Sequence, residues 1–275
     1  MKSIIIRMFF LAVATCSATN LLYAQSSVKP NDTVKKTQIP VAVLKPKGPK
    51  AITHEMSAGL RLNSNGWSIY TDIGKVKAKD IKHSDMFYNV RFWQIEFTEK
   101  KNPREQKITS DYGGVTGGTG KYIYGKINNF YAVKLGLGFR TLIAGKPDPG
   151  TVSIHWVNAF GVSIGLLKPY YLNVYSDPSA IKFADATTQS DFLNQQVIEG
   201  KAAFTKGLSE IKVNPGGHFK SAFHFDFSTN RKNVMGVEVG ANVEYYSQAI
   251  PLMANQTATP YFVDMFVAFQ YGRRW

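Results

Sequence analysis

From Thr53 onward, apolar and polar residues alternate with a period of two over segments of roughly nine to fourteen residues. Successive side chains of a strand point to opposite faces, so this period indicates strands rather than helices. In the clearest segment, Phe223, Phe225 and Phe227 alternate with His224 and Asp226. The pattern predicts an all-β fold.

The alternation defines about eight segments. They span residues 53–62, 67–77, 86–98, 129–142, 151–165, 218–228, 234–247 and 261–274. The third segment loses phase between Phe92 and Trp93, which predicts a β-bulge. In the fifth segment, Asn158 interrupts the apolar row.

The connections between these segments alternate in length. Compact turns at 144–150 and 229–232 alternate with long links at 99–128, 166–217 and 248–260, and the short turn 63–66 is the exception. Short turns at one end and long links at the other are typical of an antiparallel up-and-down barrel. We therefore expect residues 51–275 to form one closed barrel.

The first fifty residues differ in composition from the rest. Lys2 and Arg7 supply a positive start, the apolar stretch extends to Ala14, and Leu22-Tyr23-Ala24 is a small-residue cleavage site, which together predict a signal peptide over residues 1–24. The alternative is a lipidated Cys16 after Val13-Ala14-Thr15. Residues 25–50, rich in Lys and Pro, are expected to be a flexible linker, and a short strand at 41–44 is the alternative.

The formal charge of +14 is unevenly distributed. The leader contributes +2 and residues 26–50 contribute +5, which leaves +7 for residues 51–275. A basic excess confined largely to a leader and a linker is weak evidence for nucleic-acid binding, and we expect none. Cys16 is the only cysteine, so cleavage after Ala24 would leave no disulfide and no cysteine-based metal site.

The end of the chain carries the most specific pattern. An apolar row reaches the terminal aromatic Trp275 in phase, and only Arg273 interrupts it with a charge. This arrangement resembles the terminal β-signal by which outer-membrane barrels are recognised for assembly. The residues assigned to the signal are Val267, Phe269, Tyr271 and Trp275.

Together with the leader and the loop pattern, the β-signal makes residues 51–275 similar to the small outer-membrane barrels of the Bacteroidetes type, within the porin-like and OmpA-like superfamily. The resemblance implies a transmembrane barrel in the outer membrane, with both termini periplasmic and the long links extracellular. It also implies contact with outer-membrane lipid, lipopolysaccharide and the barrel-assembly machinery. Long strands, glycines in the polar rows and aromatics near strand ends favour lipid over a soluble sandwich.

With about eight strands, a barrel has room inside for side chains and little more. The rows assigned inward contain charges of both signs, and buried charges must be paired. The inward set is Glu55, Arg61, Asp72, Arg91, Glu96, Lys134, Arg140, Lys220, His224, Asp226, Glu238, Glu244 and Asp264. We predict a salt-bridged plug in which Lys220, His224 and Asp226 face Glu238 and Glu244. A proton or ion pathway is the alternative.

Motifs for chemistry are weak. The glycine-rich segment 113–121 lacks the Walker spacing and is interpreted as a loop tip. The histidines lack a helical zinc spacing, so no metal and no cofactor is expected. His155 with Ser153 or Ser163 is a candidate set for a lipid-A-modifying enzyme, since all three lie on one face of the fifth segment.

The link 166–217 has two interpretations. It folds over the barrel mouth as a lid or an adhesive surface, or it is a flexible loop. Within 185–200, the spacing of Phe192, Leu193 and Val197 is compatible with a helix, and Asp191 is a possible N-cap. Our leading hypothesis is a non-enzymatic barrel that acts as an envelope anchor for a protein partner or binds through its outside loops. The alternatives are a lipid-A-modifying enzyme and a narrow passive channel.

Overall fold

The computed structural model describes residues 52–78, 88–110, 120–146, 150–175, 177–185, 188–230 and 232–275. The chain divides into two units, residues 1–47 and 48–275, and all described residues belong to the second. The expected signal peptide at 1–24, the linker at 25–50 and the possible strand at 41–44 lie outside the described residues, as does most of the loop 113–121.

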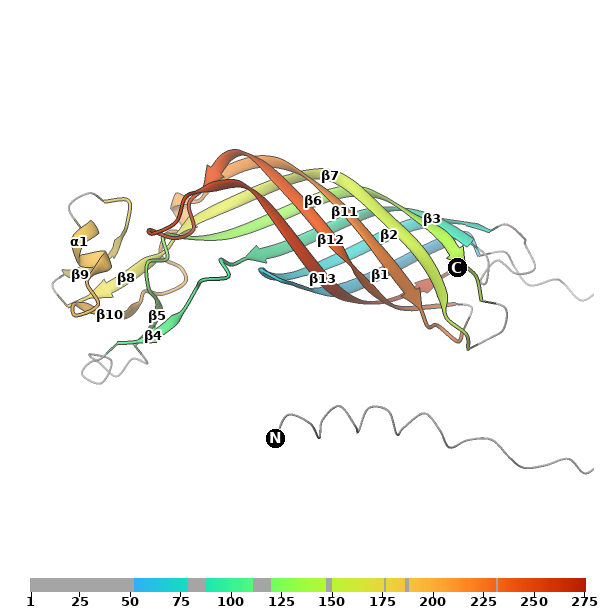
Figure 1. Ribbon diagram of the computed structural model, residues 1–275, viewed down its shortest axis with the longest axis horizontal. Helices are drawn as coiled ribbons and strands as arrows, with labels where there is room; N and C mark the ends of the chain where they lie inside the picture. The colour runs from blue at the N-terminus through green and yellow to red at the C-terminus, as the bar shows by residue number, and fades with distance from the viewer. Residues whose placement is uncertain are drawn as a thin grey trace, which may run out of the picture. The chain divides into compact units, whose positions relative to one another are not determined.

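Eight long strands form a closed barrel in which every neighbour is antiparallel (Figure 1). Their order around the barrel is β1-β13-β12-β11-β7-β6-β3-β2. Their bounds are β1 His54–Asn63, β2 Gly66–Ala78, β3 Tyr88–Lys100, β6 Asn128–Ala144, β7 Ser153–Pro169, β11 Lys212–Asp226, β12 Asn233–Ile250 and β13 Thr259–Arg274. The predicted fold class and strand number are confirmed.

The first and last strands close the barrel. Their register runs from Glu55 opposite Arg274 to Asn63 opposite Phe266. At the seam, the backbone N–H groups of Thr53 and His54 both donate to the carbonyl oxygen of Trp275, each at 2.9 Å. Closure gives every barrel strand two partners, so the barrel has no open edge at which another chain could add.

The predicted bulge in the third segment is wrong. β3 pairs without a register shift with both β2 and β6, and Phe92 points inward while Trp93 points outward. Phe92 fits inside because Gly138 lies next to its ring, where a Cβ atom would collide with it. The uninterrupted phase turns Arg91 to the exposed outer face, which corrects its expected inward position.

The strands define two ends of the barrel. The loop end carries the β1–β2, β3–β6, β7–β11 and β12–β13 connections, and the terminal end carries both ends of the described barrel chain. Among the described residues, no helix is long and apolar enough to cross a bilayer.

Additional short elements lie at the loop end (Figure 1). β4 (Lys107–Thr109) pairs with β5 (Lys121–Ile123), and β8 (Tyr171–Val174) is the central strand of a sheet with β9 (Asp177–Lys182) and β10 (Ile198–Lys201). A short helix α1 (Gln189–Leu193) and a 3-10 turn (Leu208–Glu210) complete the segment between β7 and β11. We call this segment, residues 170–211, the loop head.

The loop head has a hydrophobic core of its own. Leu172, Val174, Ile181, Phe192 and Ile198 are buried together, and Tyr122 of β5 and Tyr170 join them. The expected helix over 185–200 is mostly wrong, because the chain after α1 continues into β10 and pairs with β8. Asp191 lies inside α1, and Thr188 occupies the N-cap position.

Candidate functional site

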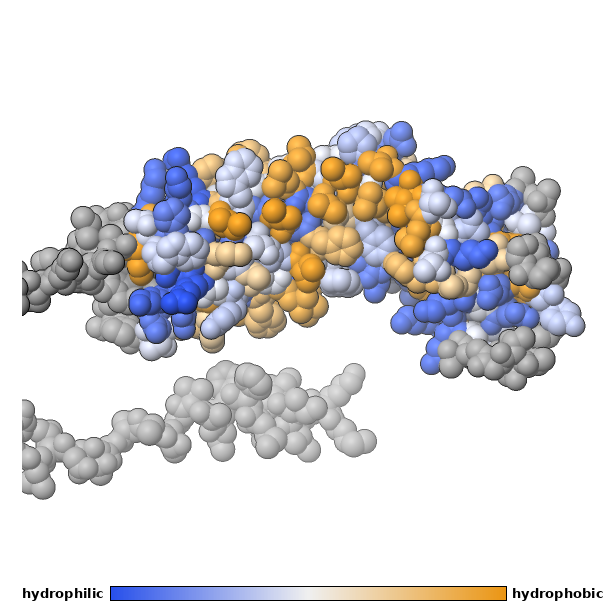
Figure 2. Space-filling view, turned by 180° about the vertical axis from the view of Figure 1, so that it is seen from behind, coloured by the Kyte–Doolittle hydropathy of each residue, from blue (hydrophilic) through white to orange (hydrophobic). Residues whose placement is uncertain are grey.

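The outer face of the barrel is apolar. Every barrel strand carries large hydrophobic side chains that are more than one third exposed, and Figure 2 shows them as a band on one face between hydrophilic ends. They include Leu60, Ile73, Trp93, Ile95, Leu135, Trp156, Phe160, Val162, Phe223, Val239, Val263 and Phe269. A continuous apolar surface of this extent is unstable in water, so lipid is its natural solvent.

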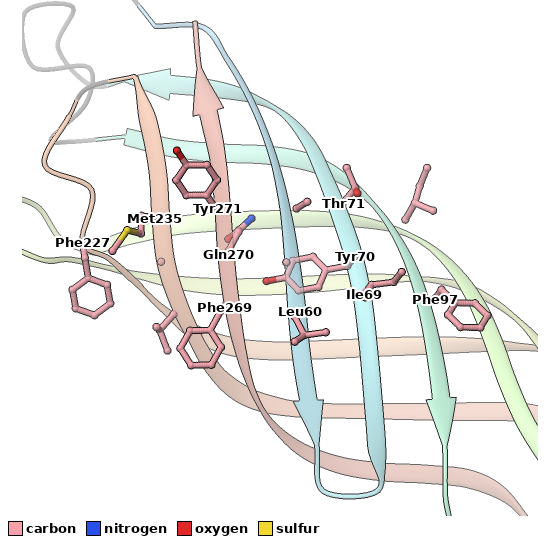
Figure 3. A pocket seen from close by; sticks show the side chains of 15 residues that line it. Leu60, Ile69, Tyr70, Thr71, Phe97, Phe227, Met235, Phe269, Gln270 and Tyr271 are labelled. Atoms are coloured by element: carbon pink, nitrogen blue, oxygen red, sulfur yellow. The ribbon is translucent and has the colours of Figure 1, made fainter.

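A shallow groove of about 900 Å³ crosses this outer face (Figure 3). Large side chains such as Leu60, Ile69 and Phe269 line it, and the small residues Gly59 and Gly236 are also part of its lining. No charged side chain lines the groove. It is therefore part of the lipid-facing surface rather than a polar binding site.

Aromatic side chains mark the loop-end rim of the belt. Phe97 stacks on Tyr131 with ring centroids 6.0 Å apart and meets Trp67 edge-on at 6.2 Å. The Trp67 indole N–H donates to Glu99 at 2.6 Å. Rings with an apolar body and a polar tip are typical of a membrane–water interface.

The barrel interior is filled by charged side chains, beginning with a loop-side cluster. Lys134 Nζ lies 2.5 Å from Glu244 and 3.0 Å from Glu96, and Glu96 also binds Arg61 at 2.5 Å. Lys100 joins the cluster through Glu244 at 2.9 Å and through Asp264. All six side chains of this cluster are nearly inaccessible to solvent.

A second cluster fills the terminal end of the interior. Arg274 donates to Glu55 at 2.8 Å and to Asp226 at 2.7 Å, and Arg140 donates to Glu55 at 2.6 Å. The Tyr88 hydroxyl donates to Asp226. These bonds connect β1, β3, β6, β11 and β13 across the interior.

Between the two clusters, Lys220 lies 3.3 Å from Glu238, and His224 Nδ1 lies 3.4 Å from the same carboxylate. Lys220 Nζ also lies 5.6 Å from the centre of the Tyr70 ring and 5.9 Å from that of Phe92. The interior therefore carries buried charges and rings at both ends and in between.

The structure places all seven predicted lumen residues inside the barrel, and it confirms the expected pairing of Lys220 and His224 with Glu238 but not the rest of the pairing. Glu238 faces Lys220 and His224, whereas Glu244 contacts Lys134 and Lys100. Asp226 binds Arg274 and Lys146. Alternation assigns a residue to the inner face, but the partners across the lumen depend on barrel curvature, which brings β6 and β12 together.

Several interior residues were missed in the sequence, and they include Tyr88, Lys100, Lys146 and Arg274. Arg274 and Lys100 were detectable, because they extend the inward rows of Gln270 and Glu96 in phase. The apparent phase break at Phe92 concealed the inward position of Tyr88. Lys146 follows β6 in a turn, where alternation carries no information.

The candidate catalytic set is not assembled. His155 is fully buried, and neither of its ring nitrogens has a hydrogen-bond partner among the described residues. Ser163 instead contacts His218 Nδ1 at 2.9 Å, and Ser153 Oγ has no partner in the described part of the chain. Within the described residues, no three His, Cys, Asp or Glu side chains are grouped to hold a metal ion.

A surface ion pair connects two parts of the loop head. Lys182 Nζ lies 2.6 Å from Glu210, which also accepts a hydrogen bond from the Tyr171 hydroxyl at 2.5 Å. The Lys182 ammonium holds the pKa of the Glu210 carboxyl below its usual value. This contact ties β9 to the turn that leads into β11.

The closed strands, the apolar outer belt and the charged interior define a transmembrane β-barrel with a side-chain-filled lumen. No protein-family model matches the sequence, and no curated protein sequence matches it either.

Three solved outer-membrane barrels are similar in structure. The N-terminal β-barrel domain of Pseudomonas aeruginosa OprF has 7% identity and a TM-score of 0.36, and the match covers 82% of this chain and 100% of that one. Neisserial surface protein A has 8% identity and a TM-score of 0.33, with 81% and 95% covered. Ail, the attachment invasion locus protein of Yersinia pestis, has 8% identity and a TM-score of 0.34, with 82% and 99% covered. Similarities this low carry no information about activity.

Proposed function

We propose that this chain is a non-enzymatic outer-membrane barrel, with both termini periplasmic, that presents its loop head as a binding surface outside the cell. The resemblance of the C-terminal segment to a β-signal supports the outer membrane, and the grouping of long connections at one end supports the orientation. The anchor is the barrel, and the binding element is the head.

The observation that carries the proposal is the filled interior. Lys134, Glu244, Lys220, Glu238 and Arg140 are each at most 1% exposed. A solute that moved through the barrel would have to separate these buried ion pairs, and breaking such a pair by removing one partner costs about 3–5 kcal/mol. The loop head, in contrast, has its own core and an exposed surface, as a binding module requires.

Planar-bilayer recordings test the closed lumen. The purified full-length chain should produce no conductance steps under conditions where a general porin, reconstituted in the same lipid, gives stable steps. Reproducible single-channel steps from the wild-type chain would support the passive-channel alternative and reject the proposed closed lumen.

Pull-down of envelope proteins tests which part of the chain binds. One variant lacks residues 26–50, and the other carries a two-residue turn in place of residues 169–210. We expect captured partners to be lost only with the second variant. If the captured proteins were lost only with the first variant, the segment before the barrel would be the binding element, and the proposed role of the loop head would be wrong.

A further inference from the structure

A basic cleft of about 380 Å³ lies at the loop end, on the outer side of the β6–β7 rim. Its walls come from the ends of β3 and β7, from β5, and from the head segment after β10. Seven lysines and two glutamates line it. The groove on the outer face has no charged lining, and two further cavities at the loop end contain at most two lysines each.

The two glutamates neutralise only two of the lysines. Glu105 pairs with Lys126 at 2.8 Å, and Glu99 pairs with Lys101 at 3.5 Å. Within the described part of the chain, the remaining five lysines form no ion pair. They are Lys107, Lys121, Lys168, Lys201 and Lys206. The cleft therefore has an unbalanced positive charge that an anion would neutralise.

Lys168 is the most informative of the five. It is only 4% exposed, and its Nζ lies 4.5 Å from the centre of the Phe204 ring. An aromatic ring face offsets only part of the free-energy cost of removing an ammonium group from water, whereas a paired anion offsets more of this cost. A buried lysine that has no carboxylate partner and lies in a cleft with further lysines is the arrangement expected of an anion-binding site.

The position of the cleft identifies the kind of anion. Along the outer face of β6 and β7, the paired residues are Val133 with Ile164, then Tyr131 with Leu166, then Asn129 with Lys168. Alternate residues of a strand share a face, so the apolar belt, the aromatic rim and Lys168 lie in one row. A ligand whose charge enters the cleft can therefore lay its apolar part along the belt.

We propose that this cleft binds the phosphate groups of a membrane lipid in the leaflet on the loop side, with Lys168 as the central ligand. Five unpaired ammonium groups fit a headgroup with two phosphates, because one phosphate monoester carries only about −1.5 to −2 charges. The proposal rests on the membrane orientation in the proposed function, but it does not depend on a protein partner of the head.

Native mass spectrometry of the full-length chain in detergent tests this site. The probes are diphosphoryl lipid A, with two phosphates, and phosphatidylcholine, with one phosphate and a balancing cation. We expect preferential retention of diphosphoryl lipid A. Lys168→Gln should weaken it about tenfold, the effect of losing one hydrogen bond to a charged group. The control is Lys75→Gln, an exposed lysine of β2 near the terminal end, and it should bind like wild type.

Thermal unfolding gives a second readout that separates binding from folding. Lipid A should raise the unfolding temperature of the wild-type chain and of Lys75→Gln but not that of Lys168→Gln. Without lipid, Lys168→Gln should be at least as stable as wild type, because it removes an uncompensated buried charge. Equal lipid affinity of the two variants would overturn the proposal.

Free pyrophosphate distinguishes a lipid from a soluble anion. If pyrophosphate bound with the same affinity as diphosphoryl lipid A, the site would be one for soluble phosphates, and the lipid assignment would be wrong. These measurements involve neither conductance nor a captured protein, so their failure is distinct from failure of the proposed function.

Discussion

The buried charge of Glu244 is tolerated because this carboxylate meets several partners. Glu244 accepts from Lys134, Lys100 and the Asn242 amide, and its other oxygen accepts from the Tyr246 hydroxyl at 2.7 Å. Without its charge, Lys134 would keep only Glu96 and Lys100 would keep only Asp264, so the two buried ammonium groups would lose the carboxylate that they share. This shared carboxylate therefore contributes to the stability of the loop-side cluster.

We predict that Glu244→Gln lowers the free energy of unfolding by about 1–3 kcal/mol, the usual cost of leaving buried hydrogen-bonding groups without their partner. Urea titration in lipid vesicles, followed by tryptophan fluorescence, measures it. Glu199→Gln is the matched control, since Glu199 is half-buried and belongs to no ion pair among the described residues. A difference below about 0.5 kcal/mol between the two variants would contradict this role for Glu244, since surface changes usually stay within that range.

At the scale of the strand, close approach of neighbouring backbones depends on particular glycines. A Cβ atom at Gly161 of β7 would collide with the Leu135 carbonyl oxygen and lie 2.5 Å from the Gly136 Cα of β6. At Gly217 of β11, the nearest atom to an added Cβ would be the Gly161 carbonyl oxygen at 3.5 Å. The two glycines are close in the sheet but differ in the space available.

Gly161→Ala should therefore lower the free energy of unfolding by about 1–3 kcal/mol, as overpacking does, while Gly217→Ala should change it by less than about 1 kcal/mol. The same urea titration compares the two variants. Equal effects would show that β6 and β7 separate easily and that the close contact has no energetic weight.

For the whole molecule, the barrel and the loop head have separate hydrophobic clusters. β7 and β11 remain paired as far as Leu167 opposite Lys212, so a short turn can join them directly. The barrel should accordingly fold without the head.

Replacing residues 169–210 with Asn-Gly should leave a barrel that still shows a heat-dependent shift in gel mobility and a β-type circular dichroism spectrum, because an Asn-Gly turn suits a two-residue hairpin. The full-length chain is measured alongside. Loss of the gel shift would mean that the head is required for the barrel to close.

Strand existence was predictable from the sequence, but strand ends were less so. β6 was predicted over 129–142 and spans Asn128–Ala144, where alternation is regular. β11 was predicted from 218 but begins at Lys212, because Pro215, Gly216 and Gly217 conceal the alternation. The link between β7 and β11 was predicted over 166–217 but spans only 170–211, mainly because the start of β11 was not recognised.

The sequence alone determined the fold class and which residues of most strands face inward, because a period of two is a local property of the chain. Cross-lumen partners such as Lys134 with Glu244, the row that joins Lys168 to the apolar belt, and the core of the loop head were decided only by the tertiary structure. These contacts join residues far apart in the chain, and they depend on barrel curvature and on how the connections fold back, neither of which leaves a local pattern.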